Sequence, residues 1–191
     1  MEPLQGGRLA SVPDAIERQL KERDPQRSTS SWAFRFVGTY PKVLTALSGM
    51  TYMSHLEDNL KSFCNFKPLT EEELEFIEKM ASLIHDYPTV NCNDCKYCMP
   101  CPFGIDIPGI FKSYNNSVND GYIAQSREQE DYARLKRRYL INYNRSVETL
   151  RQADHCISCG HCVRHCPPSI DIPRELRKID LYIEKLKKDT L

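Results

Sequence analysis

The chain has 191 residues, and its 26 Lys and Arg side chains balance its 26 Asp and Glu side chains, so the formal net charge is zero. This balance argues against a nucleic-acid-binding protein, which normally carries a basic face. No stretch reaches the ~18 apolar residues of a membrane span, and the N-terminal sequence MEPLQGGRLA lacks the basic and apolar regions of a secretory signal. We therefore expect a cytoplasmic location, with no membrane span and no nucleic-acid partner.

The nine cysteines are more informative than the overall composition. Disulfide frameworks are typical of small secreted domains, whereas thiols stay reduced in the cytoplasm. Closely spaced cysteines in a reducing compartment indicate metal ligands. We therefore interpret the cysteine clusters of this chain as metal sites.

The hydrophobic pattern predicts mostly helices. One short apolar run, VLTAL at residues 43–47, predicts a buried strand that ends at Ser48-Gly49. Ser54 and Glu57 have the spacing of a capping box, as do Thr70 and Glu73, and each pair predicts a helix start. The predicted helices cover residues 13–39, 54–63, 70–86, 108–116, 127–144 and 173–188. Because the strand candidates all precede residue 50, we place a boundary at Tyr87-Pro88 and expect domains over 1–88 and 89–191.

Two cysteine motifs form an internal repeat. Each has three cysteines separated by two residues, then a fourth cysteine before a proline, then Ile-Asp-Ile-Pro and a predicted helix. The ligand candidates are Cys92, Cys95, Cys98 and Cys101 in the first motif and Cys156, Cys159, Cys162 and Cys166 in the second.

Three thiolates at two-residue intervals can wrap three corners of an iron–sulfur cubane. The spacing resembles that of two-cluster ferredoxins, in which the fourth cysteine ligates the other cluster. The resemblance implies two [4Fe–4S] clusters, one on Cys92, Cys95, Cys98 and Cys166 and one on Cys156, Cys159, Cys162 and Cys101. The first motif has only Met99 and Pro100 before its fourth cysteine, one residue fewer than the common pattern, so the assignment of Cys101 depends on this shorter spacer.

A structural zinc site is the alternative for these cysteines. Zinc sites usually pair two Cys-x2-Cys units across a longer span, because four ligands surround one ion tetrahedrally, and the present spacing fits that pattern poorly. The isolated Cys64 is interpreted as a small buried apolar residue. The histidines beside the second motif are interpreted as hydrogen-bonding or exposed side chains rather than ligands; they are His155, His161 and His165.

The long segment between the two motifs carries predicted helices, and a compact β-type ferredoxin has no room for it. This arrangement resembles the α-helical ferredoxin domain of flavin- and pyridine-nucleotide-linked oxidoreductases. The first 66 residues resemble the last two strand–helix units of an aldo/keto reductase barrel. That resemblance is carried by Pro3, Leu4 and Gly7, by the helix through Trp32 to Val37, by the predicted strand before Gly49, and by Asp58-Asn59.

The chain thus resembles the C-terminal part of the iron–sulfur-containing aldo/keto reductases. The implied fold is mainly α, with a helical dicluster domain preceded by the last strand–helix units of an incomplete TIM barrel. The family's catalytic Asp, Tyr, Lys and His come from the first half of the barrel, so the resemblance implies no catalytic residue here and leaves enzyme activity open. A remnant barrel over residues 1–66 would expose apolar faces, and its partner would be the missing barrel half or a redox protein.

The resemblance also implies a nucleotide site, because the family binds NADP at its last strand and the following helix. The matching positions are Gly49, Met50, Thr51, Asp58 and Asn59. A helix N-terminus there would favour a phosphate. A solvated first turn is the alternative for Asp58 and Asn59. NAD(P) is expected only in a complete barrel.

Three functions follow from these patterns. The first is the electron-transfer portion of an oxidoreductase of the aldo/keto reductase family. The second is a stand-alone ferredoxin-like electron carrier without catalysis. The third is a zinc-stabilised interaction module. Metal and sulfide content separate the third from the other two.

Overall fold

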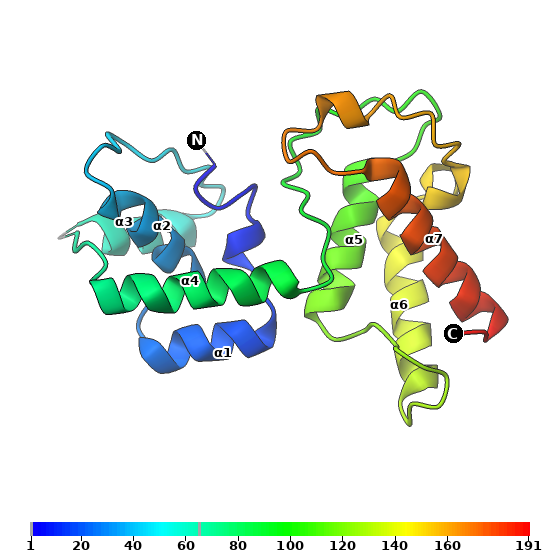
Figure 1. Cartoon of the computed structure of the whole chain (residues 1–191), viewed down its shortest axis with the longest axis horizontal. Coiled ribbons are helices and arrows are strands. Elements are labelled where there is room, and N and C mark those ends of the chain that lie inside the picture. Colours follow the sequence, from blue (N-terminus) through cyan, green and yellow to red (C-terminus); the bar gives the residue numbers. More distant parts are fainter. Residues whose placement is uncertain (1, 65) are drawn as a thin grey trace. The chain divides into compact units, whose positions relative to one another are not determined.

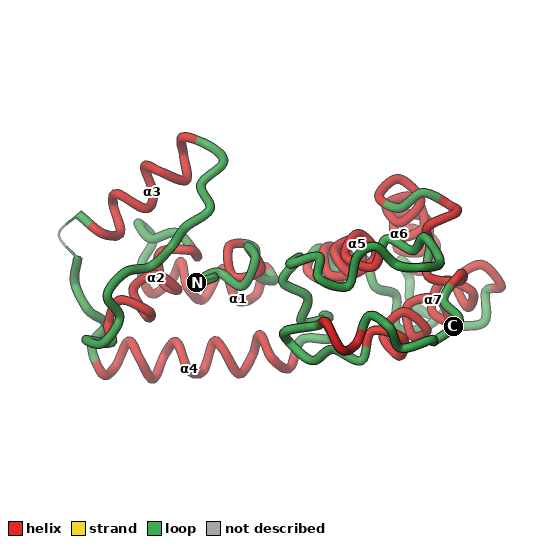
Figure 2. Tube along the Cα trace, turned by 90° about the horizontal axis from the view of Figure 1, so that it is seen from above, coloured by secondary structure: helices red, strands yellow, loops and turns green. Residues whose placement is uncertain are grey.

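The computed structural model describes residues 2–64 and 66–191. The chain forms two compact units, Met1–Tyr87 and Pro88–Leu191. Among the described residues every regular element is a helix, with none in a strand (Figures 1 and 2). Within the same described residues, no helix is long and apolar enough to cross a membrane.

The first unit packs its helices around one apolar cluster. Its elements are η1 (Arg8–Ala10), α1 (Asp14–Arg23), α2 (Thr29–Thr39), α3 (Met53–Phe63) and α4 (Glu71–Asp86). The buried side chains of this cluster are Val12, Ile16, Leu20, Trp32, Leu69 and Met80. The predicted capping box is confirmed at the start of α4, where Thr70 and Glu73 bond reciprocally. The capping box predicted at Ser54 and Glu57 is wrong, because α3 begins at Met53 with Tyr52 as its N-cap and no side-chain cap hydrogen bond.

A buried ion pair ties α2 to the start of α4. Arg35, only 5% exposed, donates to both carboxylate oxygens of Glu73 at 2.8 and 2.9 Å, and its remaining donors reach the carbonyls of Lys67 and Pro68. The hydrogen bond from Arg35 lowers the pKa of Glu73. One carboxylate therefore serves both as a helix cap and as the partner of a buried guanidinium.

The strand predicted over residues 43–47 is wrong. The segment is irregular, and its apolar side chains face solvent, with Leu44 98% and Leu47 58% exposed. A strand is stabilised by hydrogen bonds to a neighbouring strand, and the described residues offer no such neighbour. The strand–helix units of an incomplete TIM barrel are therefore not formed in the described part of the chain.

The second unit is built from α5 (Ile107–Asn119), α6 (Tyr132–Ser146) and α7 (Ile172–Lys188), which lie side by side in Figure 1. The short elements η2 (Thr149–Arg151), η3 (Ala153–His155) and η4 (Val163–His165) belong to the loops. The predicted α6 stripe is confirmed, since its apolar face is buried; it comprises Tyr132, Leu135, Tyr139 and Tyr143.

Two helix bounds of this unit differ from the prediction by three residues or more. Helix α6 begins five residues later than expected, because the Gln129 side chain accepts the backbone N–H groups of Gln125 and Ser126 and holds this segment as a turn. Helix α5 continues past residue 116 to Asn119, because Ser117 and Val118 are buried by packing that the local sequence does not reveal.

Two stacked tyrosines of α6 allow a matched test of packing. Both rings are buried, but the Tyr139 hydroxyl has no hydrogen-bond partner among the described residues, whereas the Tyr143 hydroxyl accepts the Ala153 N–H at 3.1 Å. Tyr139→Phe should stabilise the unit by about 1 kcal/mol, and Tyr143→Phe should destabilise it by about 1–2 kcal/mol. Urea unfolding measures both. Equal changes of the same sign would contradict this assignment.

Alkaline pH should unfold the second unit. Burial raises the pKa of both Tyr143 and Tyr182 to about 12. Because the folded state holds these protons more tightly than the unfolded state, their contribution is complete below about pH 10 and is lost as the pH rises to about 12.

Circular dichroism and tyrosinate absorbance, followed together over this range, should show that the helices are lost together with the last phase of tyrosine ionisation. Tyr182→Phe should make the pH dependence shallower. Ionisation of all tyrosines near pH 10 with the helices intact would contradict the prediction.

Candidate metal centre

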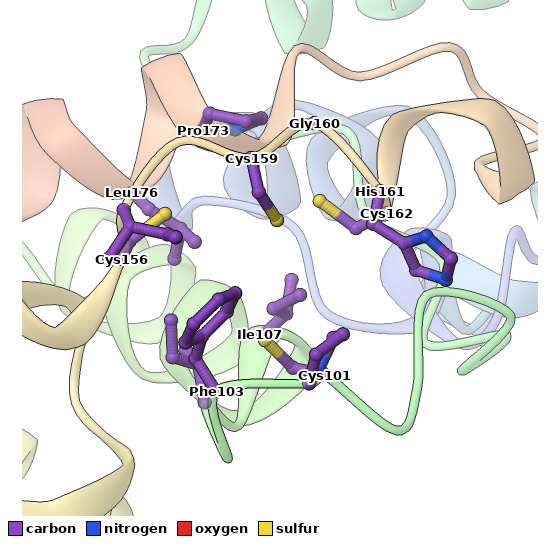
Figure 3. Close-up of a pocket in the computed structure, with 13 residues that line it drawn as sticks. Cys101, Phe103, Ile107, Cys156, Cys159, Gly160, His161, Cys162, Pro173 and Leu176 are labelled. Atoms are coloured by element: carbon purple, nitrogen blue, oxygen red, sulfur yellow. The ribbon is translucent and has the colours of Figure 1, made fainter.

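Four cysteines from both motifs surround one cavity in the second unit. Figure 3 shows the sulfur atoms of Cys101, Cys156, Cys159 and Cys162 pointing into the same space. This cavity contains about 330 Å³ of empty space, part of it open to solvent. Its remaining wall is largely apolar and includes Phe103, Ile105, Ile107, Pro173 and Leu176.

The other four motif cysteines surround a second, similar cavity. Its lining contains Cys92, Cys95, Cys98 and Cys166, and its empty space is about 310 Å³, again partly open. The walls come from the starts of α5 and α7 and from the residues that precede α7; they are Ile107, Pro108, Phe111, Pro168, Ile170 and Ile172. The structure thus brings together the same two sets of four sulfurs that the spacing implied.

One side chain belongs to the walls of both cavities. Ile107, the first residue of α5, lines each of them and is almost completely buried, with 1% of its surface exposed. The two sulfur-lined cavities are therefore neighbours that share an apolar wall residue.

The sequence repeat is also a conformational repeat. Asp94 and Lys96 of the first loop have positive φ angles of 54° and 63°, and the corresponding Ser158 and Gly160 have 59° and 73°. After the fourth cysteine, left-handed residues recur again, at Gly104 and Ser169, each donating its N–H to the carbonyl of the preceding motif cysteine. Left-handed residues tighten a loop so that its side chains converge.

The repeated Ile-Asp-Ile-Pro sequence starts a helix in both places. Asp106 accepts the N–H of Gly109, and Asp171 accepts the N–H of Arg174, so each aspartate caps its helix. Ile107 and Ile172, the isoleucines before the prolines, are buried. The motif therefore anchors each cysteine loop to the bundle at a defined helix start.

The fourth cysteine of the first motif meets the second set despite its shorter spacer. The Met99–Pro100 peptide bond is cis, whereas the three-residue spacer of the second motif forms η4. Beyond this point, hydrogen bonds tie the first repeat to η2, which precedes the second motif. The Asp106 N–H donates to the Arg151 carbonyl at 3.0 Å, and the Arg151 side chain donates to the Gly104 carbonyl at 3.2 Å.

Burial and mutual repulsion disfavour free thiolates in both cavities. Burial raises the pKa of the Cys98 thiol to about 11, with contributions from Cys92 and from Cys162 of the other set. Burial likewise raises the pKa of Cys92, with repulsion from Cys166, and that of Cys162, with repulsion from Cys101. A bound cationic centre is what allows such a group of sulfurs to stay deprotonated together.

The chemistry of the lining fits an iron–sulfur cluster. Each cavity offers four cysteine sulfurs and otherwise mostly apolar walls, which is the donor set of a [4Fe–4S] cluster. Among the described residues, no three His, Cys, Asp or Glu side chains form a group that could hold a metal ion directly. The sulfurs of each set instead face a space between them.

The histidines of the second loop lie outside the circle of sulfurs. The His161 ring is beside Cys162 and away from the centre in Figure 3, and it packs against His165 at 5.5 Å between ring centroids. The His155 ring nitrogen lies 3.3 Å from the Thr149 carbonyl oxygen. Cys64, which the sequence placed in the core, is exposed in the first unit.

The residues matched to a nucleotide site lie in the first unit. Gly49, Met50 and Thr51 are exposed, on the irregular segment before α3. Asp58 accepts the Ser28 hydroxyl at 2.6 Å, and Asn59 donates to the Ser48 hydroxyl at 3.0 Å. Asp58 and Asn59 are thus engaged with the protein itself, and their role in nucleotide binding stays a prediction.

Residues 91–170 match the family model described as 4Fe-4S dicluster domain. This segment is a 4Fe-4S dicluster domain. The match confirms the predicted iron–sulfur character and suggests an electron-transfer role. No curated protein and no solved structure matches the chain, so the aldo/keto reductase resemblance of residues 1–66 stays a prediction.

The left-handed positions of the dicluster loops make a local prediction. A Cβ at Gly160 would meet no atom within 4 Å, so Gly160→Ala should cost only its left-handed strain, about 1–2 kcal/mol. Ser158→Gly, in the same loop, relieves such strain and should stabilise by a similar or smaller amount. Thermal unfolding of the anaerobically prepared protein measures both. Destabilisation by Ser158→Gly would contradict the loop conformation.

Proposed function

We propose that the second unit binds two [4Fe–4S] clusters and serves as an electron-transfer module. The first cluster is assigned to Cys92, Cys95, Cys98 and Cys166, and the second to Cys156, Cys159, Cys162 and Cys101. When bound, such clusters supply one-electron redox chemistry. The observation that carries the proposal is the pair of four-sulfur cavities that share Ile107 as a wall.

The protein's own residues contribute ligation and exclusion of water. Buried apolar side chains such as Ile105, Phe111 and Leu176 form the walls behind the sulfurs. A dry, weakly polar surrounding tunes the reduction potential of an iron–sulfur centre and limits its hydrolysis. The partition formed by Ile107 supports a short path between the two centres.

We further propose that this module belongs to an NAD(P)-linked aldo/keto reductase, with the remaining part of the barrel as its partner. The sequence resemblance of residues 1–66 supports this assignment. Exposed apolar side chains of the first unit also support it, because Leu44, Leu47 and Met53 are more than half exposed and would be covered by a partner. NAD(P) would bind at Gly49, Met50, Thr51, Asp58 and Asn59 of the complete assembly.

The second candidate is a stand-alone electron carrier. It is favoured by the second unit being a compact unit of its own, whose helices bury Ile110, Tyr139 and Ile179. A zinc-stabilised interaction module is the third candidate. It has no support from the dicluster match.

Metal analysis tests the module itself. The anaerobically purified protein should contain about eight irons and eight sulfides and give an EPR signal after reduction. A colourless protein with stoichiometric zinc would overturn the proposal.

Paired Cys→Ser substitutions test which sulfurs share a centre. If Cys101 ligates with the second motif, Cys101→Ser combined with Cys159→Ser should damage one centre and leave about four irons. The matched pair, Cys101→Ser with Cys95→Ser, should damage both centres and leave almost none. The reverse pattern would show that each motif binds its own cluster without exchange.

Calorimetric titration with NADPH tests the reductase context. The chain alone should show no binding, because the proposed site requires the complete barrel. Binding should appear when a candidate barrel protein is added and should weaken in Asp58→Ala. If no barrel protein that associates with the chain restores binding, the stand-alone carrier is favoured.

A further inference from the structure

Each cysteine loop begins next to a buried residue that is bonded to the first cysteine of its motif. The carbonyl of Val90, a residue 3% exposed, accepts the backbone N–H of Cys92 at 2.8 Å. The carbonyl of Ala153, a residue 2% exposed, accepts the backbone N–H of Cys156 at 3.0 Å. We call Val90 and Ala153 the entry residues. The backbone position of the first cysteine in each motif therefore depends on where its entry residue lies.

The first entry residue is held by a side chain of α5. The Asn115 amide oxygen accepts the Val90 N–H at 2.8 Å, and the Asn115 amide nitrogen donates to the Val90 carbonyl at 2.8 Å. Both polar backbone groups of Val90 are thus bonded to one side chain. Because the two bonds must keep their geometry together, the pair fixes the orientation of this backbone segment as well as its distance from the helix.

The second entry residue is held by a side chain of α6. The hydroxyl of Tyr143, whose ring is buried, accepts the Ala153 N–H at 3.1 Å. The preceding residue, Gln152, is held as well, because its side-chain nitrogen donates to the Val147 carbonyl at 3.2 Å and to the Asn144 side-chain oxygen at 3.1 Å. The chain therefore reaches the second motif along a path that is bonded to α6 and to the residue that ends it.

These contacts are not part of the sequence repeat. Residues 89–91 read Thr-Val-Asn, whereas residues 153–155 read Ala-Asp-His. An amide holds one entry residue and a phenol holds the other. In both places, however, a helix side chain bonds to the backbone residue whose carbonyl accepts the N–H of the first cysteine. Different side chains thus meet the same constraint at the same point of each loop.

A fixed entry matters because the sulfurs of each set resist being gathered. Neighbouring thiolates repel one another and lose hydration when they are buried. The far end of each loop is already anchored by the helix caps at Asp106 and Asp171. A loop anchored at one end only can open at the other, and each bond at the entry residue raises the free energy of that local opening.

We propose that Asn115 and Tyr143 are positioning residues, each of which holds the first cysteine ligand of one centre through its entry residue. The inference rests on the proposed electron-transfer function and adds two residues that do not themselves ligate iron. Asn115 acts on the centre that contains Cys92, and Tyr143 acts on the centre that contains Cys156. Side chains outside the ligand set commonly control the retention of a metal centre in this way.

Iron release from the intact, cluster-loaded chain tests the proposal. The variants Asn115→Leu and Tyr143→Phe remove the hydrogen bonds with little change in side-chain size. Each should release about four of about eight irons roughly fivefold faster, because a lost hydrogen bond raises the population of the open loop by about this factor. The remaining irons should leave at the unmodified rate. Anaerobic transfer of iron to an absorbing ferrous chelator measures both phases.

The double variant and two controls show whether each side chain acts on its own centre. Asn115→Leu combined with Tyr143→Phe should release all the iron faster, because the two side chains act on different centres. The controls are Asn116→Leu, at an exposed position beside Asn115, and Tyr139→Phe, which removes a hydroxyl without a partner among the described residues. Both controls should leave the release rates unchanged.

Three results would overturn the positioning role while leaving the electron-transfer function in place. They are equal acceleration of all the iron by either single variant, unchanged rates in both, and a double variant that still holds about four irons at the unmodified rate. An Asn115→Leu protein that purifies with about four irons would support the role, and one with almost none would contradict it. An unmodified protein that lacks about eight irons would instead contradict the proposed function itself.

Discussion

The arrangement of the second unit depends on an exchange of cysteines between its two loops. Cys101 leaves its own motif and lies with the second set of sulfurs, and Cys166 does the reverse. Each cavity is therefore complete only when both loops are seated on the helices. The position of the loops on the helices is fixed by the caps at Asp106 and Asp171, by the left-handed residues of both loops and by the hydrogen bond between Asp106 and Arg151. They fix where each loop begins and ends relative to α5 and α7.

Because of this exchange, the helices rather than the cysteine loops must supply the apolar burial that keeps the sulfurs together. Four neighbouring thiolates repel one another and lose hydration, so the loops alone have little tendency to bring them together. Side chains such as Ile107 and Ile172 supply apolar burial at the helix starts. The tyrosine-rich core between α6 and α7 lies behind this wall, where Tyr139 meets Tyr182 edge to face. The helices thus stabilise loops that would otherwise open.

Features set by near neighbours could be predicted from the sequence, and features set by distant partners could not. The Thr70–Glu73 capping box and the α6 stripe through Tyr139 depend on spacing within a turn or two, and both predictions are confirmed. The strand over residues 43–47 required a second strand, which pattern alone does not supply. The grouping of Cys101 with the second motif was implied by resemblance rather than by its own spacer. The exposure of the Ile157 side chain depends on the folded surface, and no local sequence pattern predicts it.

The exchange of cysteines has a consequence for the repeat itself. One repeat alone carries three sulfurs for its own cavity and lends the fourth to another, so an isolated copy leaves its cavity one ligand short. Two separate copies could complete each other as a reciprocal pair, like the subunits of a symmetric dimer. When the two repeats are joined in one polypeptide, each cavity obtains its fourth sulfur at any protein concentration, because the repeat that supplies this sulfur is covalently attached.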